Sequence, residues 1–170
     1  VLSKIEVNEK VLKSTNLTVL LENHAIDIAC ITTNGPSHAK LAIQCMEAGV
    51  KYVMVEKPMA CSIEECQMMI DTARKTKTRL VVDHPRRYSL NYGYIQRNIQ
   101  SGRWGKIRSV YIQRPGIGLG CLGTHSFDLA TYLVNKPVQS VAAWVDQPVK
   151  DNPRGAQFVD PGGTVILNYG

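Results

Sequence analysis

The sequence predicts an α/β fold in which a parallel sheet is followed by part of an α+β domain with an open, mainly antiparallel sheet. Three short, nearly continuous apolar runs indicate the parallel strands, because strands covered on both faces carry few polar residues. Helical patterns lie between these runs, and the order strand, helix, strand gives parallel neighbours with right-handed crossovers. After about residue 88 the apolar residues alternate with polar ones, which is typical of strands with one solvated face.

The three parallel strands are expected at residues 26–33, 52–58 and 79–85. The helix after the first strand begins at Pro36, a favoured first-turn residue, and stops at Gly49. The helix after the second strand opens at Ser62, which forms a capping box with Glu65 and precedes a face of apolar residues at helical spacing. Each crossover therefore has its own start signal.

The second part of the chain is expected to begin with a helix at residues 89–101, which Gly102 ends. Another helix is expected from Thr124 to Asn135. Two runs with alternating polarity predict strands of the antiparallel sheet, residues 106–113 and residues 137–145. This change of pattern predicts two domains, residues 1–87 and residues 88–170.

Composition and charge exclude several classes of protein. The 170 residues carry a formal net charge of +6, but the basic residues are scattered, so we expect a small anionic ligand rather than a nucleic acid. No apolar run approaches the roughly 20 residues that a membrane-spanning helix needs, and no signal peptide is visible. We therefore expect a cytoplasmic protein with no membrane partner. The five cysteines form no C-x-x-C pair and are expected to be reduced.

Residues 118–123, GLGCLG, satisfy the dinucleotide-binding pattern G-x-G-x-x-G and precede an expected helix. Asp146 also follows at about the distance of a ribose-binding acid. A dinucleotide fold, however, needs this turn directly after a buried parallel strand, whereas residues 106–113 alternate and the chain then breaks at Arg114-Pro115. A flexible glycine-rich approach to a helix is therefore favoured over a phosphate cradle.

Three segments resemble, in order and spacing, the Gfo/Idh/MocA family of nicotinamide-dependent sugar and polyol oxidoreductases: Thr32–His38, Val55–Pro58 and Asp83–Tyr88. The resemblance extends from about Leu17 to the end of the chain. In that family a Glu-Lys-Pro triplet ends the fifth strand of the cofactor domain, and a run with a histidine and an aspartate opens a helix on the substrate side. The matching residues are Glu56-Lys57-Pro58 and the run from Gly120 to Asp128, so the resemblance makes residues 118–123 a substrate-side loop.

The resemblance implies an incomplete Rossmann-type parallel sheet, which makes residues 1–87 a partial nucleotide-binding domain. It makes residues 88–170 a partial substrate and oligomerisation domain. Nothing in Val1–Asn16 supplies the family's first strand and glycine-rich turn, so we expect a partial chain. The implied activity is hydride transfer between NAD or NADP and a sugar, polyol or related hydroxy compound. A homo-oligomer formed through the C-terminal sheet is expected at full length.

The resemblance assigns catalysis to Lys57 and His125. Lys57 would stabilise a developing alkoxide, and His125 would act as general base because imidazole titrates near neutral pH. Cys121 stands where the family usually carries an aspartate that pairs with the histidine, so proton transfer would run through Asp128 or Lys57, or the reaction would differ. Asp128 could orient His125 or interact with the helix dipole. From residue type alone, Lys57 could equally be a solvated lysine and His125 a structural histidine.

The remaining site residues also rest on the resemblance. The cofactor contacts are expected to be Thr32, Asn34, His38, Glu56, Lys57 and Pro58. The substrate contacts are expected to be Arg86, Tyr88 and Thr124. Local roles compete with these assignments, because Asn34 and His38 also suit a turn and the first turn of a helix. Cys121 and His125 have i, i+4 spacing, but no further ligand pair is visible and no metal site is expected.

Three functions agree with these patterns. The leading one is a nicotinamide-dependent oxidoreductase. The second is a family member that binds a nucleotide or sugar as a sensor or regulator without turnover, which Cys121 in place of the aspartate favours. The third is an oligomerisation platform, since a broad one-faced sheet commonly pairs with another subunit.

Overall fold

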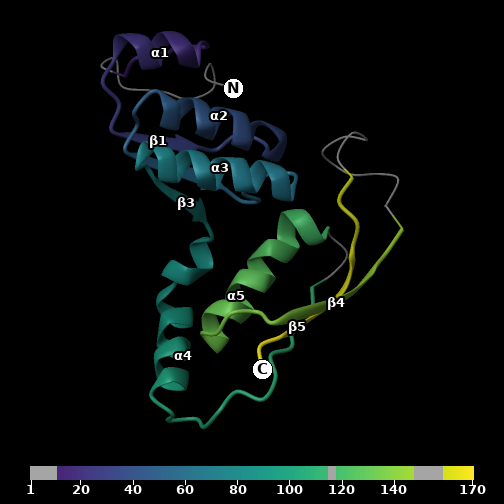
Figure 1. Ribbon diagram of the computed structural model, residues 1–170. Helices are drawn as coiled ribbons and strands as arrows, with labels where there is room; N and C mark the ends of the chain where they lie inside the picture. Colours follow the sequence, from purple (N-terminus) through teal and green to yellow (C-terminus); the bar gives the residue numbers. More distant parts are fainter. Residues whose placement is uncertain (1–10, 115–117, 148–158) are drawn as a thin grey trace.

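The computed structural model describes residues 11–114, 118–147 and 159–170. Three parallel strands form the first sheet, in the order β1-β2-β3 (Figure 1): β1 (Ile28–Ile31), β2 (Tyr52–Glu56) and β3 (Arg79–Asp83). The register aligns Ile31 with Val55 and Val55 with Val82, so the three strands end at one edge of the sheet. The predicted α/β class and all three parallel strands are confirmed.

Helices α2 (Gly35–Glu47) and α3 (Ile63–Thr76) pack against each other and against the strands. The Ser62 hydroxyl accepts a hydrogen bond from the Glu65 N–H at 3.1 Å, as the capping box predicts. Fully buried side chains of α2, β2 and α3 fill the space between the layers, including Met46, Val55 and Met69. This core fixes the loops that leave the carboxyl ends of the strands.

A shorter helix, α1 (Leu17–Asn23), precedes β1 and was not predicted. The side-chain oxygen of Asn16 caps it by accepting a hydrogen bond from the Val19 N–H at 3.3 Å. Leu17 and Leu21 of α1 pack against the core. With only 7 residues, α1 is too short for helical periodicity to stand out in the sequence.

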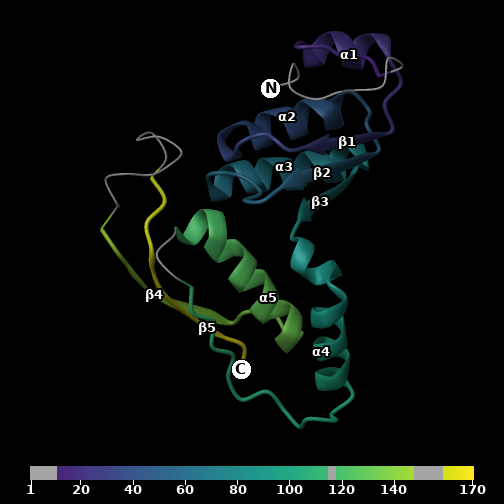
Figure 2. The same cartoon turned by 180° about the vertical axis from the view of Figure 1, so that it is seen from behind.

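The second part of the chain comprises η2 (Pro85–Tyr88), α4 (Leu90–Gln100), η3 (Leu119–Gly123), α5 (Thr124–Val134), β4 (Ser140–Val145) and β5 (Gly163–Asn168). Helices α4 and α5 lie side by side in both views (Figures 1 and 2). Strands β4 and β5 pair antiparallel, with Val141 opposite Leu167. The two expected helices and the antiparallel pairing are confirmed, while the domain boundary at residue 88 stays a prediction.

The predicted strand at residues 106–113 is wrong, because this segment has no regular secondary structure. A strand needs a neighbour for its backbone N–H and C=O groups, and within the described residues β4 pairs with β5 alone. Tyr111, in the middle of the segment, is 86% exposed. The break expected at Arg114-Pro115 lies partly outside the described residues. Across the described part of the chain, no helix is long and apolar enough to cross a membrane.

Candidate active site

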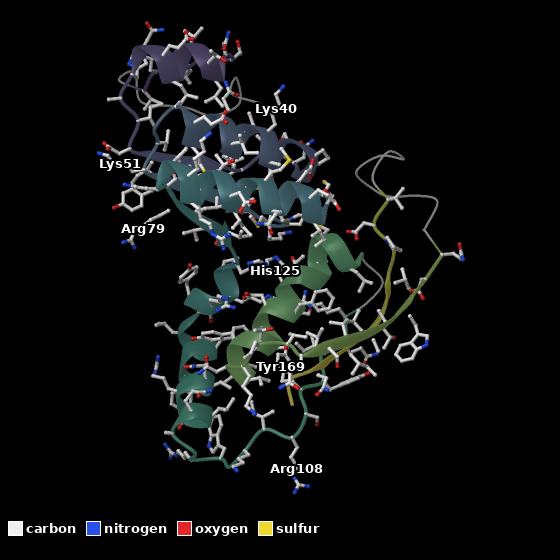
Figure 3. All side chains as sticks on the ribbon, viewed as in Figure 1. Lys40, Lys51, Arg79, Arg108, His125 and Tyr169 are labelled. Carbon is white, nitrogen blue, oxygen red and sulfur yellow. The ribbon has the colours of Figure 1, made fainter. Side chains whose placement is uncertain are left out.

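An open cleft of about 1000 Å³ lies where the carboxyl ends of β1 and β2 meet η3, the turn that leads into α5. This is the edge at which open parallel sheets bind ligands. Four segments line the cleft: residues 32–36, residues 56–58 and 60–61 with Glu65, residues 120–121 and residues 159–160. Thr124 and His125, which were expected at the site, follow this turn and are not among the residues that line the cleft. In Figure 3, His125 lies at the junction between the parallel sheet and α5, whereas Lys51 and Arg79 lie away from it at the amino ends of their strands.

The first wall of the cleft is the turn between β1 and α2. Thr32 and Asn34 both line the cleft, as expected. The Ser37 hydroxyl donates to the Asn34 carbonyl at 2.8 Å and lies 2.6 Å from the Thr33 hydroxyl, so local side chains fix the turn. Pro36 occupies the first turn of α2, where its missing N–H costs nothing.

His38 does not line the cleft, although the sequence analysis placed it on the cofactor. Its side chain is 1% exposed. Its Nδ1 lies 2.8 Å from the Pro58 carbonyl oxygen, and its Nε2 lies 3.1 Å from the Thr33 carbonyl oxygen. His38 therefore connects the turn after β1 to the turn after β2, and these are the turns that carry the other expected cofactor contacts.

Lys57 follows β2 and reaches across the cleft to the start of α5. Its Nζ donates a hydrogen bond to the Cys121 carbonyl oxygen at 2.9 Å and lies 3.6 Å from the Cys121 Sγ. The Lys57 N–H donates to the Glu56 carboxylate at 3.2 Å. Glu56, Lys57 and Pro58 all line the cleft. The amine of Lys57 is thus held at the cleft by Cys121 of η3 rather than extended into solvent.

His125 lies in the first turn of α5, and its Nδ1 is buried without a hydrogen-bond partner among the described residues. Burial lowers the pKa of His125 most strongly, and the positive charges of Lys57 and Arg86 lower it further. The ring meets that of His84 edge to face, with 5.9 Å between centroids. The environment therefore favours neutral imidazole, which is the form that can accept a proton.

The residues before and after His125 also carry buried polar atoms. Thr124 Oγ1 and Ser126 Oγ are buried and have no hydrogen-bond partner within the described ranges. Buried polar atoms are normally paired, so three adjacent unpaired atoms at one helix start form an unusual cluster. Thr124 was expected on the substrate side, whereas Ser126 was not singled out by any sequence signal.

Asp128 contacts Arg87 and His84. Arg87 Nε donates to both carboxylate oxygens of Asp128, at 2.7 and 2.8 Å, and its guanidinium lies over the Tyr132 ring. His84 Nδ1 lies 4.0 Å from Asp128 Oδ1. Asp128 therefore joins η2 to α5, and the Nδ1 of His125 receives no bond from it.

From the sequence, Arg87 was considered with Arg86 and Tyr88 as a residue at the cleft, but it is not among the lining residues. His84 was missed as a neighbour of the site, although it lies in the segment that carried the resemblance. Of the two expected substrate contacts in this segment, Arg86 is near enough to His125 to affect its pKa. The Tyr88 side chain is 71% exposed and does not line the cleft.

Residues 118–123 do not form a phosphate cradle. Five of them form the turn η3, which continues directly into α5. The N–H groups of Gly120 and Cys121 donate to the two carboxylate oxygens of Asp160, at 2.7 and 2.8 Å. This run is the approach to a helix, as favoured above, but a carboxylate from far along the chain holds it. No local sequence signal indicated Asp160.

Residues 3–84 match the sequence model of an oxidoreductase family described by its NAD-binding Rossmann fold. Residues 3–84 belong to the Gfo/Idh/MocA family. The fold of the whole chain agrees with this assignment, and the resemblance seen in the sequence is confirmed. Within the described residues, no group of three or more His, Cys, Asp or Glu side chains could hold a metal ion.

Relatives of known structure include the WlbA dehydrogenase from Chromobacterium violaceum, crystallised with NADH and UDP-GlcNAcA. It is 28% identical, has a TM-score of 0.75, and the match covers 92% of this chain and 49% of that one. Myo-inositol 2-dehydrogenase from Thermotoga maritima is 25% identical over 73% of this chain and 41% of its own length. An uncharacterized oxidoreductase from Synechocystis is 26% identical over 86% of this chain and 44% of its own. The chain thus spans somewhat less than half the length of each of these three proteins.

Proposed function

We propose that this chain forms the central part of an NAD(P)-dependent oxidoreductase that transfers hydride between a nicotinamide cofactor and a sugar, polyol or related hydroxy compound. The observation that carries the proposal is the contact of Lys57 with η3, directly before the helix that carries His125, at a cleft of an NAD-binding fold. Lys57 supplies a held cation, and His125 supplies a base that favours its neutral form. Oxidation of an alcohol needs a base for the hydroxyl proton and a nicotinamide to accept the hydride, and a nearby cation stabilises the developing alkoxide.

The cofactor would lie along the turns after β1 and β2. Thr32, Asn34, Glu56 and Lys57 line the cleft there, and the start of α2 offers backbone N–H groups at a helix amino end. The cleft is open and large enough for a nicotinamide and its ribose. When bound, NAD or NADP supplies the hydride acceptor or donor. His38 would support this site from behind, by joining the two turns.

The substrate would lie between the cofactor and the start of α5. Lys57 Nζ would donate to the reacting hydroxyl oxygen and stabilise its negative charge as the C–H bond breaks. His125, whose lowered pKa favours the neutral form, would take the hydroxyl proton. Cys121 would hold Lys57 through its carbonyl rather than serve as the proton acceptor. Asp128 would act on the site through Arg87 and His84.

The substrate class follows from the groups around His125. Thr124 and Ser126 add two unpaired hydroxyls beside Nδ1, and Arg86 adds a positive charge. These groups suit a compound with several adjacent hydroxyls, which can both donate and accept. Myo-inositol and a nucleotide-linked sugar, named for two relatives, are of this kind. Tyr88 would reach such a substrate only from the rim of the site.

The remaining features belong to the same proposal. Residues 1–87 would be the nucleotide-binding part, and residues 88–170 the substrate and assembly part. At natural length the protein would be cytoplasmic and form a homo-oligomer through the β4–β5 sheet. Val141 and Trp144 of β4 are 61% and 60% exposed, which leaves apolar surface for a second copy.

The test is cofactor reduction by a panel of polyols and sugars, including myo-inositol, followed by nicotinamide absorbance. Lys57→Met and His125→Gln should each lower turnover by roughly 100-fold or more. Lys75→Met and His24→Gln change exposed residues of the same types and should have no effect. Cofactor binding without turnover on any substrate would replace this function with the sensor. Full activity in Lys57→Met would remove Lys57 from the chemistry.

A further inference from the structure

The carboxylate of Asp160 makes an unusual contact with the turn that leads into α5. Its two oxygens accept from two successive backbone N–H groups, Gly120 at 2.7 Å and Cys121 at 2.8 Å. Hydrogen bonds to a charged acceptor are about twice as strong as neutral ones. The adjoining backbone adds a third link, because the Leu119 N–H donates to the Pro161 carbonyl at 2.9 Å. The segment before β5 therefore accepts hydrogen bonds from the N–H groups of three consecutive residues of the turn.

The glycines of this turn fit the carboxylate closely. A Cβ at position 118 would overlap the carboxylate of Asp160, and a Cβ at position 120 would lie 3.0 Å from its Oδ1. Gly118 has a φ of −39°, so its backbone does not itself require glycine. Glycine at 118 is therefore explained by the space that Asp160 takes.

The same turn carries the groups of the proposed active site. Cys121 receives the Asp160 carboxylate on its N–H and the Lys57 amine on its carbonyl oxygen. One peptide segment thus lies between a fixed carboxylate and the amine that faces the cleft. His125 follows four residues later on α5, which continues the turn without a break. Both Asp160 and Lys57 line the cleft.

We propose that Asp160 is a positioning residue for this active site. It fixes the Gly120–Cys121 peptide, and through it the Cys121 carbonyl that holds Lys57 and the start of the helix that carries His125. The positioning role rests on the proposed function, whereas the hydrogen bonds between Asp160 and the turn do not depend on that function. Loss of the carboxylate would leave Lys57 and His125 present but misplaced, and small misplacements of reacting groups are costly to rate.

The first experiment combines NMR with replacement of the carboxylate by formate. In Asp160→Ala, the amide proton signals of Gly120 and Cys121 should move upfield, the ring signals of His125 should shift, and turnover should fall roughly tenfold or more. Added formate, a free carboxylate, should restore these signals and part of the turnover. Asp71→Ala removes an exposed carboxylate on α3 and should show neither the loss nor the response to formate. Sodium chloride at equal ionic strength is the control for salt.

The outcomes separate the two levels of the proposal. Unchanged Gly120 and Cys121 amide signals in Asp160→Ala, or signals that formate does not restore, would overturn the hydrogen bonds between Asp160 and the turn. Shifted amide signals with unchanged His125 signals and unchanged turnover would overturn the positioning role. If no substrate is turned over by the parent protein, the amide and His125 signals still decide. Asp160→Asn, which preserves the side-chain shape, should shift one of the two amide signals more than the other, because one N–H keeps an accepting oxygen whereas the other faces the side-chain NH2.

Discussion

Gly118→Ala offers a quantitative test of the contact between residues 118 and 160. The new Cβ would overlap the Asp160 carboxylate, and no other group is as near to it. The backbone at 118 accepts alanine, so the cost arises from the carboxylate moving aside and losing its bonds to Gly120 and Cys121. Two charge-assisted bonds at a half-buried site, partly replaced by water, correspond to a loss of about 1–3 kcal/mol.

The assay is a double-mutant cycle in thermal and denaturant unfolding. For a chain of this length, such a loss lowers Tm by roughly 2–10 °C. In the Asp160→Ala background the Cβ has room, so Gly118→Ala should there cost less than about 0.5 kcal/mol. The reasoning is refuted if Gly118→Ala costs the same in both backgrounds, because the clash would then involve something other than Asp160.

Three further predictions concern the site and the core. His38→Ala removes the side chain that lies between the Thr33 and Pro58 carbonyl groups and should lower the free energy of unfolding in urea by about 2–4 kcal/mol. His24→Ala changes an exposed histidine and should leave the free energy of unfolding almost unchanged. Equal losses in the two variants would contradict the bridging role of His38. The pKa of His125, followed by NMR, should lie below its ordinary value. In Lys57→Met this pKa should rise without reaching the ordinary value, because burial is the larger cause of the shift. An unchanged His125 pKa in Lys57→Met would contradict the effect of the Lys57 charge. Because the pKa of His125 is lower in the folded chain than in the unfolded chain, the unfolded chain takes up the imidazole proton first as the pH falls. The free energy of unfolding should therefore decrease below about pH 6.5, and His125→Gln should weaken this pH dependence. Met46→Ala leaves a cavity at a fully buried position and should lower the free energy of unfolding by about 2–5 kcal/mol. A loss below about 1 kcal/mol would mean that the core between α2 and the sheet is loosely packed.

Much of the fold could be predicted because its signals are local. Continuous apolar runs marked β1 to β3, and the Ser62 capping box marked the start of α3. The strand at 106–113 was predicted wrongly because alternation describes one strand's faces and says nothing of a partner for its backbone. Helix α1 was missed because its single cap, Asn16, precedes only two turns.

The site was predictable where a short segment carries the chemistry. Lys57 comes directly after a strand and His125 lies at the start of a helix, and both positions could be recognised in the sequence. The structure places Lys57 on the cleft and in contact with Cys121, four residues before His125. The contact of Gly120 with Asp160 spans 40 residues, so no periodicity or spacing could indicate it. The sequence also placed His38 near the cofactor but could not reveal that its two ring nitrogens face carbonyl groups of two separate turns.

We propose above all that the turns after β1 and β2 bind a nicotinamide cofactor, whose reacting ring faces Lys57 and the start of α5. The most direct measurement is an NMR titration of NADH into the isotope-labelled protein at its natural length. Signals of Asn34, Lys57 and His125 should shift together along one binding curve. Shifts confined to other parts of the molecule, such as the β4–β5 sheet, or no shift at millimolar NADH, would contradict this proposal.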